Sequence, residues 1–205
     1  MDLIMTGISF FHKGGPVMYI LLLASIFVVT IAIERTMYFN AKDPGRSFAR
    51  DFADRLSQGD REGAARLAGS TKGALPSLLA KGMAFTGNET VSLHTFWEVQ
   101  SGIALTRFRK RLYYLNVIVT MAPLLGLLGT ISGMISAFSV FNLESGQAGT
   151  ITGGVGEALI ATAMGLCTAI IALAVHAYFT QRIDSIVSDM EQCFSLAEGM
   201  AEERE

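Results

Sequence analysis

A single carboxylate interrupts one of the most apolar stretches of this chain. Glu157 lies within residues 149–179, a stretch long enough to cross a bilayer as a helix, for which about 20 apolar residues suffice. A charged side chain is costly in hydrocarbon, and in membrane helices such residues mark a functional pathway by default. The pattern indicates a group that attracts cations near one end of the span.

Two threonines occupy comparable positions in neighbouring apolar stretches. Thr130 lies in residues 112–140 and Thr162 in residues 149–179. If the two helices are antiparallel, each threonine lies about 4.5 Å outward of the membrane midplane at ~1.5 Å per residue, and Glu157 lies about 12 Å outward. A threonine in a membrane helix usually bonds a carbonyl of its own helix. The coincidence in face and depth favours a shared polar level instead.

Both threonines lie on helix faces made of small residues. At ~100° per residue these faces cover arcs of roughly 120° and 140°. One interpretation is close helix packing, because small residues let backbones approach each other. A second is that a three-helix monomer cannot bury both faces, which predicts a closed ring of subunits. The small residues of the two faces include Gly126, Gly129, Gly133, Ala158, Ala161, Gly165 and Ala169.

The composition excludes a soluble domain. Of the 205 residues, 51% are hydrophobic and only 17% are charged, which is typical of a membrane protein. The two cysteines give no disulfide framework, and His12, His94 and His176 are isolated, so we expect no metal site and no cofactor. We expect an all-α protein with three transmembrane helices and no enzymatic activity.

The chain divides into seven segments in this interpretation, with three membrane spans separated by polar regions. They are an amphipathic N-terminal segment (1–15), a first span (16–39), a cytoplasmic helical region (40–106), a second span with its basic start (107–140), a short outer loop (141–149), a third span (150–180) and a cytoplasmic helical tail (181–205).

The region 40–106 shows helical periodicity with clear capping signals. A first helix would bury Phe48, Phe52 and Leu56, and Asp60 would cap a second. A fourth would begin at Asn88 with an inner stripe that includes Leu93, Phe96, Gln100, Ile103 and Arg107. Since no proline follows before Pro123, we expect this helix to continue into the membrane as one rod.

Basic residues predict the topology. Residues 34–111 hold 13 of the 16 lysines and arginines, so this region and the tail are expected in the cytoplasm, with the N-terminus outside. A basic cluster precedes the second span. Beside a membrane helix it favours anionic lipid headgroups over nucleic acid. The cluster consists of Arg107, Arg109, Lys110 and Arg111.

Two sequence segments resemble the signatures of the MotA/TolQ/ExbB proton-channel family, with ExbB the nearest type. They are APLLGLLGTISG, beginning at Ala122, and GVGEALIATAMGL, beginning at Gly154, and the pair Glu34–Arg35 also fits. The resemblance implies a homo-pentamer in the bacterial inner membrane around an ExbD-type single-span partner, driving a TonB-type protein. It implies that Thr130, Glu157 and Thr162 line the ion pathway.

Other functions stay open as alternatives. A TolQ-type envelope motor shares the three-span layout, a passive scaffold would use the small faces only for packing, and a lone membrane enzyme or transporter is a further class. No span carries a carboxylate near its centre, where a proton carrier needs a titratable group. We therefore expect the partner helix to supply that carboxylate, with H⁺ and Na⁺ both possible as coupling ions.

Overall fold

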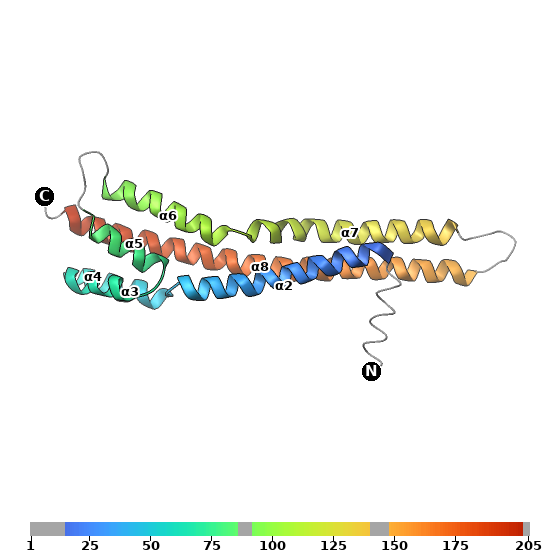
Figure 1. The fold of residues 1–205 in the computed structure, drawn as a ribbon, viewed down its shortest axis with the longest axis horizontal. Helices are drawn as coiled ribbons and strands as arrows, with labels where there is room; N and C mark the ends of the chain where they lie inside the picture. Colours follow the sequence, from blue (N-terminus) through green and yellow to red (C-terminus); the bar gives the residue numbers. More distant parts are fainter. Residues whose placement is uncertain (1–14, 86–91, 140–147, 203–205) are drawn as a thin grey trace, which may run out of the picture. The chain divides into compact units, whose positions relative to one another are not determined.

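The structure, a computed structural model, describes residues 15–85, 92–139 and 148–202; for 148–153, 157, 201 and 202 it describes the backbone alone. Every regular element in these ranges is an α-helix (Figure 1), which confirms the predicted all-α class. The helices are α2 (Gly15–Lys42), α3 (Arg46–Ser57), α4 (Arg61–Ser70), α5 (Ala74–Met83), α6 (Leu93–Arg109), α7 (Leu112–Ser139) and α8 (Ala148–Glu202).

Three helical stretches are long and apolar enough to cross a membrane. They are Gly15–Ser57, which contains α2, Leu93–Ser139, which contains α7, and Gly154–Met200, which lies within α8. The chain is therefore an all-α membrane protein with three apolar helices, as the sequence predicts.

The chain divides into two compact units. The apolar unit comprises Met1–Ala32 and Arg111–Ala177, and the polar unit comprises Ile33–Lys110 and Tyr178–Glu205. Helices α2 and α8 each contribute residues to both units.

Three predictions fall on residues outside the described ranges. They concern nearly all of the N-terminal segment 1–15, most of the outer loop 141–149, and Asn88 as the cap of a helix. Helix α8 already includes Ala148, so the part of the loop that the structure does describe is helical.

Helices of the polar unit form as their sequence patterns predict. Helix α3 buries Phe48, Phe52 and Leu56 along one stripe. Asp60 caps α4, where its carboxylate accepts a 2.9 Å hydrogen bond from the amide of Gly63 and so satisfies a donor that has no partner inside the helix. The core is completed by residues of α5, α6 and α8, among them Leu75, Leu78, Leu79, Trp97, Ile183, Ile186, Met190 and Ala197.

The predicted inner stripe of α6 is wrong at its C-terminal half. Ile103 and Arg107 are exposed, whereas Trp97 and Phe108 are buried. The helix begins at Leu93, and its N-cap is Ser92. The apolar spacing alone places the stripe through Phe96 and omits Trp97, the next residue in the chain.

Trp97 joins three helices of the polar unit. Its ring stacks on Phe194 of α8, with 5.0 Å between centroids, and its Nε1 donates to the carbonyl of Leu78 in α5 at 3.4 Å. Gly82 leaves room for the indole, because a Cβ atom there would overlap it. A buried aromatic of this size contributes much of the local packing energy.

The predicted continuous rod from the fourth helix into the second span is also wrong. Helix α6 ends at Arg109 and α7 begins at Leu112. Lys110 is extended (φ −54°, ψ 134°) and Arg111 has a positive φ of 74°, a conformation that is strained for a residue other than glycine. Residues 103–122 contain no glycine or proline, so the local sequence does not account for the break.

Candidate ion-pathway site

The small faces of α7 and α8 pack directly against each other. A Cβ atom on Gly165 would lie 2.5 Å from the carbonyl oxygen of Ala122, and one on Gly129 would lie 2.6 Å from the Cβ of Ala161. Only glycine fits at such approaches, so these residues set the close spacing of the two helices.

The sequence predicts a ring because a monomer could not bury both small faces, and this packing shows that the reason is wrong. The two faces bury each other within one chain, so they do not by themselves require further subunits. Their observed role is helix packing, and a pore-lining role for these residues stays a prediction. Those packed between the two helices include Gly126, Gly129, Gly133, Ala158, Ala161, Gly165 and Ala169.

Helix α2 packs against α7 and α8 in the apolar unit. Val17 and Leu21 pack in one cluster with Ala122 and Ala169. A second cluster joins Val28 and Ile31 of α2 to Leu115 and Ala172. The three apolar helices therefore share one packed interior, while their large exposed side chains, such as Leu124, Leu128, Ile135, Leu159 and Ile170, point away from it.

Thr162 bridges α7 and α8. Its Oγ1 donates a hydrogen bond to the carbonyl oxygen of Gly126 at 3.1 Å, and a Cβ atom on Gly126 would lie 3.0 Å from the Cα of Thr162. A threonine hydroxyl in a membrane helix usually bonds a carbonyl of its own helix. The Thr162 hydroxyl instead bonds a carbonyl of the neighbouring helix. Its partner was not predictable from the periodicity of either helix.

Thr130 behaves differently from Thr162. Its Oγ1 donates to the carbonyl of Leu127 in its own helix at 2.6 Å. Gly129 faces Ala161, and α7 and α8 are antiparallel. Thr130 follows Gly129 and Thr162 follows Ala161, so the two threonines lie one residue from this level in opposite directions. At ~1.5 Å per residue they are offset by about 3 Å along the helix axis. Their common depth in the membrane stays a prediction.

Glu157 belongs to α8, where the structure describes its backbone alone. The next residue, Ala158, packs against Gly133. Glu157 is therefore level with a position about one helical turn from Thr130. Its place in the ion pathway stays a prediction.

The predicted lipid-binding residues are all exposed. Arg107, Arg109, Lys110 and Arg111 end α6 and begin the break, and Tyr113 and Tyr114 follow, 71% and 52% exposed. Arginine and lysine next to exposed tyrosines are typical of a membrane interface. Within the described residues no group of His, Cys, Asp or Glu side chains could hold a metal ion.

Comparison with known proteins adds independent information. The profile of the MotA/TolQ/ExbB proton channel family matches residues 70–192. A Synechocystis sp. protein named ExbB-like 1 is 33% identical over 174 residues, covering 80% of this chain and 67% of the relative. The ExbB homolog of Methanothermobacter thermautotrophicus is 23% identical over 188 residues, 91% of this chain and 67% of the relative. Biopolymer transport protein ExbB of Salmonella typhimurium is 34% identical over 73 residues, 35% of this chain and 30% of the relative.

Proposed function

Because the chain belongs to the MotA/TolQ/ExbB proton channel family, we propose that it is the ExbB-like channel and motor subunit of a complex driven by the ion-motive force. In this proposal five copies surround an ExbD-type single-span partner and energise TonB-dependent transport across the outer membrane. The role is transport and force generation, without enzymatic chemistry. The names of the relatives favour an ExbB-type over a TolQ-type role.

The observation that carries the proposal is the polar level between α7 and α8. Thr130 and Thr162 lie about 3 Å apart along the helix axis, in the apolar stretches 112–139 and 149–179, whose only carboxylate is Glu157. Threonine hydroxyls do not ionise near neutral pH, whereas proton transfer inside a membrane uses groups that gain and lose a proton. The chain thus holds one half of a proton path, and the partner's membrane carboxylate supplies the other.

Large exposed apolar side chains, rather than unburied small faces, are the reason to expect that the chain forms a ring. Each apolar helix carries large exposed side chains, for example Leu23, Leu124 and Ile170, at 67%, 62% and 65%. These surfaces suit lipid on one side and neighbouring subunits on the other. The number five comes from the family.

The topology follows the charge distribution. Residues 34–111 hold 13 of the 16 lysines and arginines, and this bias favours an orientation with the polar unit on the cytoplasmic side of the bacterial inner membrane and the N-terminus outside. In this orientation Glu157 lies toward the outer mouth, and the basic cluster from Arg107 to Arg111 contacts anionic headgroups on the cytoplasmic side.

Ion flux in liposomes tests the proposal. The purified chain alone should conduct almost no protons, and co-reconstitution with an ExbD-type protein should restore conduction. Changing the membrane aspartate of that partner to asparagine should abolish it. Strong selective flux from the chain alone would contradict the proposal, as would native mass spectrometry in detergent that finds only monomers and dimers.

A further inference from the structure

The break between α6 and α7 exposes backbone carbonyls that need partners. The last carbonyls of a helix have no amide to accept from within that helix. At the end of α6 such carbonyls belong to Phe108, which is buried, and to Arg107 and Lys110, which are exposed residues. A carbonyl that is shielded from water and left unsatisfied is costly. One distant side chain satisfies all three carbonyls.

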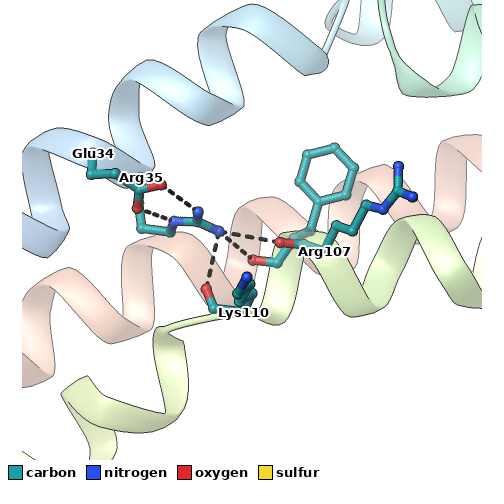
Figure 2. A network of polar contacts seen from close by, with 5 residues as sticks. Glu34, Arg35, Arg107 and Lys110 are labelled. Carbon is teal, nitrogen blue, oxygen red and sulfur yellow. Dashed lines mark hydrogen bonds and ion pairs between the residues drawn. The ribbon is translucent and has the colours of Figure 1, made fainter.

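That side chain is Arg35, at the polar end of α2. Its Nη1 donates to the carbonyl oxygens of Arg107 at 3.2 Å, Phe108 at 3.4 Å and Lys110 at 3.0 Å (Figure 2). In an uninterrupted helix each of these carbonyls would accept from the amide four residues later. Arg35 therefore competes with those amides for the acceptors that a continuous helix would use.

The guanidinium is fixed on its other sides as well. Arg35 is 3% exposed, and its Nε and Nη2 form two 2.6 Å bonds to the two carboxylate oxygens of Glu34. The guanidinium carbon lies 4.6 Å from the ring centre of Tyr38, whose ring meets that of Phe108 edge-on at 5.5 Å between centroids. A buried arginine needs this pairing, and its planar fork allows several directed bonds at once.

The sequence around the break is otherwise suited to a continuous helix. It lacks glycine and proline over 103–122, and it places Arg111 at a φ of 74°, which a continuous helix would not require. The local preference and the observed geometry are thus opposed, and the bonds from Arg35 favour the broken form.

We propose that Arg35 is a latch that keeps α6 and α7 as two separate helices, and that its release lets residues 109–113 close into one continuous helix. Arg35 then acts as a positioning residue at the point where the chain passes from the polar unit to the apolar unit. The proposal concerns the joint itself and does not depend on which ion or partner the protein uses.

Hydrogen exchange of single amides tests the latch in the full-length protein. In the latched form the amides of Leu112 and Tyr113 lie in the first turn of α7, where helix amides lack intrahelical partners. In a continuous helix they would donate to the carbonyls of Phe108 and Arg109. Arg35→Met keeps an unbranched side chain as far as the position of Nε and removes the hydrogen-bond donors. We expect exchange at Leu112 and Tyr113 to slow by about tenfold or more, since exchange of a bonded amide requires local opening.

A matched control is available in the same unit. Arg182 donates to Asp43 at 3.1 Å and to Asn40 at 3.2 Å but to none of the α6 carbonyls in the described contacts. Arg182→Met removes a similar paired arginine and should leave exchange at Leu112 and Tyr113 unchanged. Unchanged or faster exchange at these amides in folded Arg35→Met would overturn the proposal, because the residue would then be a plain stabilising contact.

Folding of the variant can be checked independently. The Cys193 thiol is fully buried, and burial raises its pKa to about 12, so it should resist alkylation at pH 8 in any variant whose polar unit is intact. If Arg35→Met fails this check, Arg35→Leu takes its place, since it also has no hydrogen-bond donor. Exchange at Leu112 as fast as in the wild type in folded Arg35→Leu would equally overturn the latch.

Discussion

Thr162 donates its hydroxyl to the carbonyl oxygen of Gly126, 3.1 Å away on the facing helix. Within α7 the same carbonyl accepts from the amide four residues later, that of Thr130. The two threonines predicted to share a level are thus connected through one backbone oxygen. An interaction of this kind both fixes the register of α7 against α8 and places a hydroxyl near the proposed pathway.

Thr162→Val should lower stability and ion-driven activity together. The swap keeps the side-chain shape and removes a bond between helices, which costs on the order of 1 kcal/mol. Thermal unfolding in detergent measures the first effect, and TonB-dependent uptake measures the second. Thr168→Val is the matched control, because the Thr168 hydroxyl bonds its own helix at Met164. Wild-type stability and uptake in Thr162→Val would remove both roles.

Thr130→Val separates pathway chemistry from packing. The Thr130 hydroxyl bonds Leu127 of its own helix, so its loss should leave stability within about 0.5 kcal/mol. We expect ion-driven activity to fall while the assembly, measured by native mass spectrometry, stays intact. Normal uptake at normal expression would show that this hydroxyl is only a local bond.

Sequence periodicity was sufficient for α3, for the start of α4 and for the small faces of α7 and α8. The spacing of Phe48, Phe52 and Leu56 predicted α3, and the position of Asp60 predicted the cap of α4. These features depend on residues within one or two turns of each other. The alternation of glycine and alanine likewise identified which sides of α7 and α8 tolerate a close neighbour.

Periodicity does not identify which helix packs against each small face. The small faces of α7 and α8 meet each other, and neither pattern contains that information. The break at Lys110 depends on Arg35, some 75 residues earlier in the chain, so a local reading predicts an uninterrupted helix. Trp97 was missed for a related reason, since its partners Leu78 and Phe194 come from two other helices.

Ionised Asp189 should make the polar unit less stable near neutral pH than at acidic pH. Partial burial raises its pKa, with Asp43 adding to the effect while Arg46 and Arg50 oppose it. A pKa that is higher in the folded than in the unfolded state gives stability that is present at low pH and lost as pH rises through the folded value. Asp189→Asn should therefore match the wild type near pH 3.5 and melt at a higher temperature near pH 7. A lower melting temperature at pH 7 would mean that the ion pairs with the arginines dominate.

Glu157→Gln tests whether charge near the outer mouth matters. The change keeps the size of the side chain and removes its attraction for cations, so conduction by the reconstituted complex should fall. The difference should be larger at 10 mM than at 1 M salt, because screening lengths are about 30 Å and about 3 Å in these solutions. Equal conduction by both proteins at low salt would leave the carboxylate without an electrostatic role.

Gly165→Ala should disrupt the packing of α8 on α7. Its Cβ atom would lie 2.5 Å from the carbonyl oxygen of Ala122, which is backbone and cannot move aside cheaply, so we expect a loss of about 1–3 kcal/mol. Gly156→Ala is the control in the same helix, because nothing lies within 4 Å of a Cβ atom there. That variant should be neutral or more stable by up to about 1 kcal/mol, since alanine restricts the unfolded chain. The measurement is the melting temperature in detergent, followed by the yield of assembled complex. Equal melting temperatures for the two variants would show that the α7–α8 contact at Gly165 relaxes without cost, and that the close approach of the helices does not depend on this glycine.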